Sequence, residues 1–92
     1  MNGFEKEKRI LKALSHQTRL AIVARLLDGD ECVGGIEDLL HIKQANISQH
    51  LSILRWAGVV GFRPEGKTRC YYLKEPEKIR SLFELLRNFT EG

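Results

Sequence analysis

The stretch GGIEDLLHIKQANISQHLSILRW, residues 34–56, contains two helical patterns joined by a short turn. The first covers about residues 34–40 and places its apolar residues on one side: Ile36, Leu39 and Leu40. The second begins at Gln44 and repeats apolar residues at the spacing i, i+4 and i+7: Ile47, Leu51 and Leu54. This spacing predicts a helix with one buried face. Only His41-Ile42-Lys43 separates the two patterns, so the pair is predicted to form a helix-turn-helix.

The pattern changes from helical to extended after Gly58. Residues 59–63 and 68–73 are rich in β-branched and aromatic residues, and the turn-forming segment PEGK (residues 64–67) lies between them. These runs predict a two-stranded β-hairpin. A hairpin directly after a helix-turn-helix is the arrangement of a winged helix-turn-helix domain.

Three further helices complete the predicted fold. Apolar spacing indicates helices over about residues 5–14 and 18–27, the second with Ser15 as its N-cap. Pro76 fits the first turn of a last helix that reaches about residue 90. A chain of 92 residues is long enough for one domain. We therefore expect residues 1–92 to form a single, mainly α domain with a small β-hairpin, in the order of four helices, hairpin and last helix.

The composition limits the classes of function. The net charge is +3 and the pI is about 9.1, which permits nucleic-acid binding without demonstrating it. No apolar run approaches the roughly 18 residues of a membrane span, and the first residues lack the apolar stretch of a signal peptide. We therefore expect a cytoplasmic protein with no membrane partner. Two cysteines are too few for a disulfide scaffold, and the cytoplasm keeps thiols reduced by default.

The outward face of the predicted helix from Gln44 is polar but uncharged. Amide, hydroxyl and imidazole side chains occupy it: Gln44, Asn46, Ser48, Gln49, His50 and Ser52. Amides pair with adenine edges and hydroxyls with bases or phosphates, whereas a carboxylate would repel the phosphates. The first charge is Arg55. The pattern therefore predicts a DNA-recognition helix; the alternatives are a helix that simply faces water and, for His50, a packing role.

The predicted hairpin carries basic residues near its turn: Arg63, Lys67 and Arg69. Beside a recognition helix, these cations are expected to contact phosphates or the minor groove of DNA. For each of them, the alternative is a charge that only keeps the protein soluble.

The chain resembles the arsenic-repressor-like family of winged helix-turn-helix regulators over about residues 8–74. Four segments carry the resemblance: KALSHQTRLAIVARLL (residues 12–27), CVGGIEDLL (32–40), QANISQHLSILRWAGVV (44–60) and residues 66–73. Its most specific part is the pattern Ser48-x-His50-Leu51-x-x-Leu54-Arg55. The resemblance implies a homodimer that represses its own operon and releases DNA when an inducer binds.

The resemblance also implies which side chains face the major groove: Gln44, Asn46, Ser48, Gln49 and His50. One departure from the family pattern is Lys43, which stands where the family usually has a capping Ser or Thr. A lysine caps a helix less well, but it is expected to meet a phosphate instead.

The metal sites of this family are incomplete in this chain. One type of site uses a Cys-x-Cys pair at the start of the third helix, where this chain has Cys32-Val33-Gly34. Another type uses histidine among its ligands on the last helix, which has no histidine here. A soft metal ion needs three or four thiolates or imidazoles. We therefore expect no metal at these sites and no cofactor.

Cys32 and Cys70 are the candidate inducer-sensing residues. They would oxidise to a disulfide or polysulfide link, or bind arsenite or another thiophile. A disulfide requires that the two Cα atoms lie within about 7 Å of each other. The alternative for Cys70 is a small buried apolar residue of its strand. For Cys32, the acidic residues that precede it disfavour the reactive thiolate.

The first and last helices carry apolar stripes beyond what a small winged helix needs to bury. Six residues are expected in a dimer interface: Leu11, Ile79, Leu82, Phe83, Leu86 and Phe89. Terminal helices over about residues 4–14 and 76–90 would then set two recognition helices in successive major grooves, about 34 Å apart, on a pseudo-palindromic operator. The alternative is that both stripes close over the protomer's own core.

The sequence therefore predicts a sequence-specific DNA-binding transcriptional repressor that an inducer releases from double-stranded DNA. The alternative from another class is a winged-helix protein-interaction module, which would present an acidic or apolar helix face. No catalytic constellation and no phosphate-binding loop is recognisable, so no enzyme activity is expected.

Overall fold

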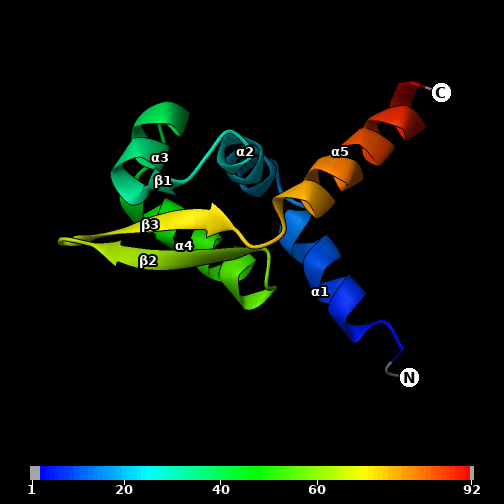
Figure 1. Cartoon of the computed structure of the whole chain (residues 1–92), viewed down its shortest axis with the longest axis horizontal. Helices are drawn as coiled ribbons and strands as arrows, with labels where there is room; N and C mark the ends of the chain where they lie inside the picture. Colours follow the sequence, from blue (N-terminus) through cyan, green and yellow to red (C-terminus); the bar gives the residue numbers. More distant parts are fainter. Residues whose placement is uncertain (1–2, 92) are drawn as a thin grey trace.

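The computed structural model describes residues 3–91 and has the mainly α, winged helix-turn-helix fold that the sequence predicts (Figure 1). Its helices are α1 (Glu5–Leu14), α2 (Gln17–Leu26), α3 (Val33–Leu40), α4 (Gln44–Trp56) and α5 (Pro76–Glu91). Its strands are β1 (Glu31–Cys32), β2 (Val60–Glu65) and β3 (Thr68–Leu73). None of the helices in the described range is long and apolar enough to cross a membrane.

The sheet has three strands, in the order β1-β3-β2, whereas the sequence predicted a hairpin alone. The hairpin itself is confirmed, because β2 and β3 pair antiparallel from Val60 opposite Leu73 to the turn. The added strand β1 places Cys32 opposite Cys70. Two residues are too few to show an alternating apolar pattern, so periodicity could not reveal this strand.

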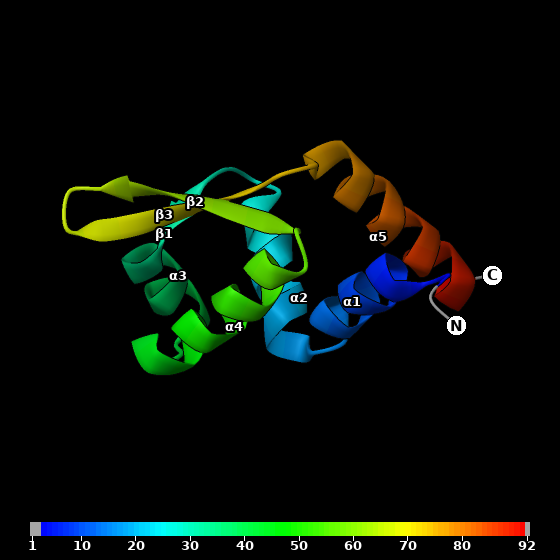
Figure 2. The ribbon, with the colours of Figure 1, turned by 90° about the horizontal axis from the view of Figure 1, so that it is seen from below.

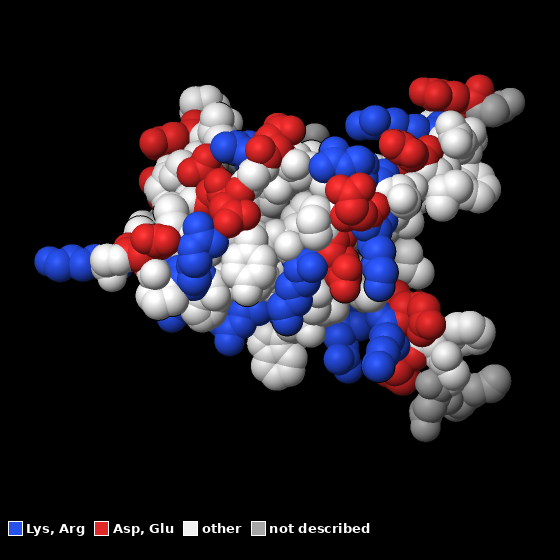
Figure 3. Space-filling model, viewed as in Figure 1, with Lys and Arg blue, Asp and Glu red and all other residues white. Residues whose placement is uncertain are grey.

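Gly66 closes the hairpin. It follows the last residue of β2 and has a φ of +61°, in the left-handed region that glycine adopts at little cost. The tight turn leaves Lys67 at the outer end of the hairpin, where the space-filling view shows a cation that extends beyond the body of the molecule (Figure 3).

The core lies between the sheet and the helices α2, α3 and α4, which Figure 2 shows on one side of the strands. Its fully buried side chains are Ile22, Val23, Ile36, Ile47, Leu51, Leu54 and Val60. Each such side chain contributes about 1.5–3 kcal/mol on burial. Because three of them lie on the inner face of α4, that face is anchored and the opposite face is presented outward.

α2 begins with a different cap from the one expected. The Nδ1 atom of His16 accepts a hydrogen bond of 3.0 Å from the Thr18 backbone N–H, so His16 rather than Ser15 is the N-cap. This cap brings the His16 ring within 4.6 Å of the His50 ring on α4, measured between centroids.

The terminal helices α1 and α5 lie at the end of the molecule opposite the hairpin tip (Figures 1 and 2). The first turns of α5 are anchored by Ile79, which keeps only 8% of its surface exposed. Its last turns project away, and the side chain of Phe89 is 85% exposed.

Candidate nucleic-acid interface

The outward face of α4 is exposed and uncharged, as predicted. Five polar residues on it are exposed: Gln44, Asn46, Ser48, Gln49 and Ser52. Lys43 occupies the N-cap position and makes no side-chain capping bond, so the first backbone N–H groups of α4 remain available to a ligand. The helix therefore offers amides, hydroxyls and its positive N-terminus on one surface.

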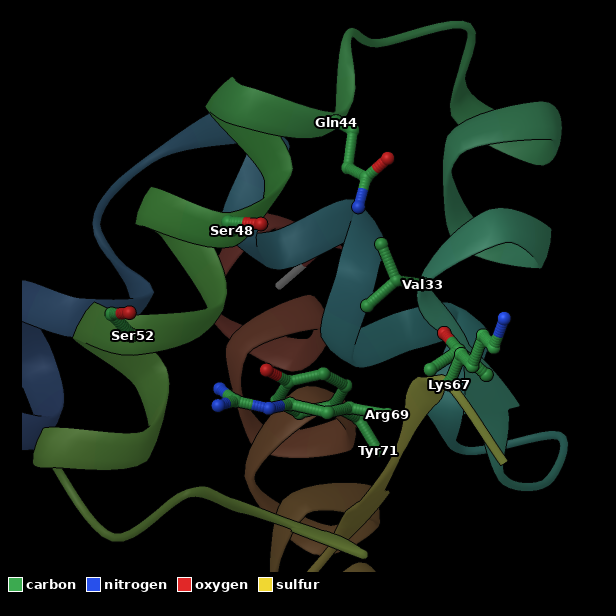
Figure 4. Close-up of a pocket in the computed structure, with 8 residues that line it drawn as sticks. Val33, Gln44, Ser48, Ser52, Lys67, Arg69 and Tyr71 are labelled. Atoms are coloured by element: carbon green, nitrogen blue, oxygen red, sulfur yellow. The ribbon is translucent and has the colours of Figure 1, made fainter. Parts of the chain in front are cut away.

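A hollow of about 260 Å³ separates α4 from the hairpin (Figure 4). Gln44, Ser48 and Ser52 face it from α4, and Arg69 reaches toward α4 from β3. Lys67, Thr68, Tyr71 and Val33 complete its lining. Two of the predicted groove-facing residues, Gln44 and Ser48, and two of the predicted hairpin cations, Lys67 and Arg69, thus surround one polar space.

Phe62 of β2 positions two of the arginines. The guanidinium carbon of Arg69 lies 4.6 Å from the Phe62 ring centroid, and that of Arg55, at the end of α4, lies 4.5 Å from it. A cation over an aromatic face at this distance is attracted by about 0.5–1 kcal/mol at an exposed site. The ring therefore links the base of the hairpin to the end of α4.

Arg63 differs from the other hairpin cations because carboxylates already bind it. Its Nη1 lies 2.7 Å from Asp30 and its Nε lies 3.1 Å from Glu65. Hydrogen bonds to Asp30 and then Glu65 raise the pKa of the Arg63 guanidinium above its ordinary value. Two negative charges offset its positive charge, so Arg63 presents less net charge to a phosphate than Lys67 or Arg69.

His50 lies on the side of α4 that faces α1 and α2, and it is half-buried. Its Nδ1 is 3.2 Å from Nη1 of Arg19. Burial, followed by the nearby His16 and Arg19, lowers the pKa of the His50 imidazole from its ordinary value of 6.5. The geometry is that of a support for α4, which was the alternative to a groove-facing role.

Cys32 and Cys70 form a disulfide between β1 and β3. Their Cα atoms are 3.7 Å apart although 38 positions separate them in the sequence. Cys70 is buried and Cys32 is half-buried. The pair therefore meets the distance requirement for a thiol switch, which the sequence left open. Across residues 3–91, no three His, Cys, Asp or Glu side chains gather closely enough to hold a metal ion.

The predicted dimer residues fall into two groups. Leu11, Leu86 and Phe89 are exposed large apolar residues, whereas Leu82 and Phe83 pack partly against the core. Ile79 is buried within the protomer and leaves only 8% of its surface to meet a partner. The reason is that the first turns of α5 pack on the domain before the helix projects.

Sequence reasoning assigned no role to Trp56, whose side chain is 82% exposed. It shares a second hollow with Gln49, Ser52 and Ile53 of α4 and with Arg19. The available signal was the spacing of Gln49, Ser52, Ile53 and Trp56, which puts all four on one helix face. The contribution of Arg19 had no local signal, because it comes from another helix.

A helix-turn-helix with an uncharged polar outer face, followed by a basic hairpin, defines the class of winged helix-turn-helix transcription regulators. The family model of the bacterial regulatory proteins of the arsR family matches residues 16–61. The chain belongs to this family, which confirms the resemblance found in the sequence.

Named relatives agree with this assignment. The chain is 38% identical over 92 residues to the transcriptional activator HlyU of Vibrio cholerae, covering 94% of this chain and 84% of that protein. It is 42% identical over 77 residues to the biofilm growth-associated repressor of Agrobacterium fabrum, covering 84% of this chain and 65% of that protein. The relatives' names therefore include both an activator and a repressor.

Solved structures are similar over nearly the whole chain. HlyU from V. cholerae superposes with a TM-score of 0.80 at 35% identity, covering 96% of this chain and 95% of that one. Reduced HlyU superposes with a TM-score of 0.78 at 36% identity, covering 89% and 88%. The homodimeric winged helix-turn-helix DNA-binding domain of Mb0332 from Mycobacterium bovis superposes with a TM-score of 0.83 at 28% identity, covering 95% and 80%.

Proposed function

We propose that this chain is a dimeric, sequence-specific DNA-binding transcriptional repressor without enzymatic activity. One observation carries the proposal: no exposed position of α4 before Arg55 holds a charged residue, and the hairpin beside it supplies cations. Such a helix can enter the major groove without repelling phosphates. The A. fabrum relative is named a repressor and the V. cholerae relative an activator, and we propose repression for this chain.

The exposed side chains divide into two roles. Gln44, Asn46, Ser48 and Gln49 read base edges, because their amides and hydroxyls are free on the outer face of α4. Lys43, Lys67 and Arg69 contact phosphates, which position the protein without reading sequence. In this proposal His50 and Arg63 support the interface through their partners Arg19 and Asp30.

The dimer forms through α1 and α5, whose exposed apolar residues lie at the end away from the hairpin: Leu11, Leu85, Leu86 and Phe89. The homodimeric state of the Mb0332 domain supports a dimer for this chain. A two-fold dimer pairs with a pseudo-palindromic operator, whose half-sites lie about 34 Å apart. The DNA partner is therefore a duplex with inverted half-sites.

The inducer acts at Cys32 and Cys70. Two thiols and one peroxide give one disulfide, water and an alcohol, so the thiols supply two electrons and two protons to the peroxide. The disulfide ties β3 to the residue that precedes α3. This restrains how the hairpin adjusts to DNA, and we expect the reduced protein to bind the operator more tightly. Arsenite bridging both thiolates is the second inducer chemistry for the same pair.

The test begins with selection of a duplex from a random library, followed by fluorescence anisotropy. Selection of one inverted-repeat sequence supports the proposal; binding of all duplexes alike, or none, overturns it and favours a protein-interaction module. Affinity is then measured with dithiothreitol and after peroxide treatment. A loss of affinity that disappears in Cys32→Ser supports the thiol switch, and equal affinity in both states makes the disulfide purely structural.

A further inference from the structure

A second hollow adjoins the first one along α4 and shares Ser52 with it. This α1–α4 groove has a volume of about 550 Å³ and opens to solvent between α1, the start of α2 and α4. Its apolar part is formed by Ala13, Ile53 and Trp56. Three cations line it as well: Arg9, Lys12 and Arg19. No carboxylate is among its lining residues in the described range 3–91.

The charges in this groove are not compensated. Within residues 3–91, neither Arg9, Lys12 nor Arg19 takes part in an ion pair, whereas Arg25, Arg63, Lys78 and Arg80 do. The guanidinium of Arg19 is also held in place. It donates to the backbone oxygen of Ala13 at 2.6 Å and to that of Lys12 at 3.3 Å. The groove thus offers a fixed cation, two mobile ones and an exposed indole to an anionic partner.

When α4 lies in the major groove, as proposed above, the positions of the phosphates around it follow from the dimensions of the groove. The major groove is about 12 Å wide, and a helix with its side chains is about 10–12 Å across. A helix in the groove therefore has a sugar-phosphate backbone on each side. The hollow with Lys67 and Arg69 and the α1–α4 groove lie next to each other along the outer part of α4, and Ser52 borders both. Figure 3 shows cations along the lower edge of the molecule from the hairpin to α1.

We infer that the α1–α4 groove binds a sugar-phosphate backbone that flanks α4, in addition to the backbone contacts of the hairpin. Arg9, Lys12 and Arg19 contact its phosphates, and the indole of Trp56 packs on the sugars. This inference rests on the DNA-binding function proposed above and adds a second backbone contact to it.

The dimer surface does not require this groove. Phe4 and Leu11, on another face of α1, line a separate hollow with Glu7, Lys8 and Ser15. Only Lys12 borders both. The apolar stripe of α1 can therefore be covered by a second copy while Arg9, Arg19 and Trp56 stay open to DNA.

Trp56 provides a direct test, because it is the single tryptophan of the chain. Acrylamide quenching of its fluorescence is measured on the free protein and with a saturating unlabelled 30-base-pair duplex at low salt. We expect strong quenching in the free dimer and at least a twofold smaller quenching constant with DNA. A Trp56 that stays equally accessible on saturated DNA overturns the inference. So does a Trp56 already protected in the free dimer, because the partner would then cover the groove.

The second test measures how duplex affinity depends on salt. The slope of log affinity against log salt is negative, and each lost phosphate contact reduces its magnitude by about 0.9. Arg9→Gln with Lys12→Gln is therefore expected to reduce the magnitude by about 2 per protomer. The control is Lys78→Gln with Arg80→Gln, which removes the same charge from α5 and should leave the slope near that of the wild type. An unchanged slope in the α1 variant, or an equal change of slope in the control, overturns this inference but leaves the proposed DNA-binding function standing. A wild-type protein that binds no duplex overturns the proposed function as well.

Discussion

Gln49 and His50 show how one step along a helix changes the role of a side chain. Successive residues are rotated by about 100° around the helix axis. Gln49 is therefore exposed on the outer face of α4, whereas His50 turns toward Arg19 and His16. The first side chain is free to read a base, and the second holds the helix against its neighbours.

Gln49→Ala is expected to weaken binding to the selected operator by about 1–3 kcal/mol, because a bidentate amide contact to a base is lost. Binding to a scrambled duplex should hardly change. Fluorescence anisotropy on both duplexes measures the difference. Equal affinities of variant and wild type for the operator would show that Gln49 reads no base.

His50 makes the stability of the fold depend on pH. Its pKa is lower than 6.5 in the folded protein, so the unfolded chain binds the proton more readily. The free energy of unfolding therefore falls as the pH decreases from about 6.5 through the folded-state pKa, and it is fully retained above about 6.5.

His50→Gln is expected to reduce the fall in the free energy of unfolding at acidic pH. A glutamine can still accept a hydrogen bond from Arg19 but does not titrate. Urea unfolding at about pH 7.5 and about pH 5 measures the free energy of unfolding of variant and wild type. His41→Asn, which replaces an exposed imidazole, is the control. The same acid destabilisation in His50→Gln and in the wild type would contradict this explanation.

At the scale of elements, α4 and the hairpin act as one unit. Arg55 at the end of α4 and Arg69 on β3 both lie over the Phe62 ring of β2. The hairpin is also tied to the segment before α3 by the Cys32–Cys70 disulfide and by the Asp30–Arg63 ion pair. The position of the wing is thus set by contacts with both helices of the helix-turn-helix.

Lys67→Ala tests the hairpin tip, which holds a cation without a carboxylate partner among residues 3–91. Specific and scrambled duplexes should both bind more weakly by similar factors, and the salt slope should decrease by about 1 per protomer. Anisotropy titrations at several salt concentrations provide the slopes. A loss restricted to the specific duplex would mean that Lys67 reads bases instead.

At the scale of the whole molecule, two ends have different surfaces. The hairpin and α4 present polar and basic groups, whereas the far ends of α1 and α5 present apolar side chains. Acidic side chains gather around α3 and β1, whereas acidic and basic side chains alternate along α5 (Figure 3). This separation suits a dimer that joins at one end and meets DNA with the other.

Leu86→Glu is expected to convert the dimer to monomers at micromolar concentration, because it places two like charges across a two-fold apolar contact. Leu39→Glu is the control, since Leu39 on α3 is 52% exposed and Leu86 is 47% exposed. Sedimentation velocity gives the oligomeric state, and circular dichroism confirms folding of both variants. A dimeric Leu86→Glu protein would place Leu86 outside the interface. A monomeric wild type would contradict the dimer itself.

Much of the fold followed from local patterns. The spacing of Ile47, Leu51 and Leu54 predicted α4 and its buried face, and the glycine-containing turn between two β-rich runs predicted the hairpin. The exposed amides of α4 followed from the same spacing, since residues off the apolar stripe of a helix face outward. These features depend on neighbours within a few positions.

The sequence by itself thus determined the helices, the hairpin, the uncharged outer face of α4 and the family. Only the tertiary structure decided that Cys32 meets Cys70, that Asp30 neutralises Arg63, and that Arg19 supports His50. The positions in these pairs are 31 to 38 residues apart. The physical reason is that periodicity reports which face of an element is apolar, whereas the partner of a side chain depends on how whole elements pack together.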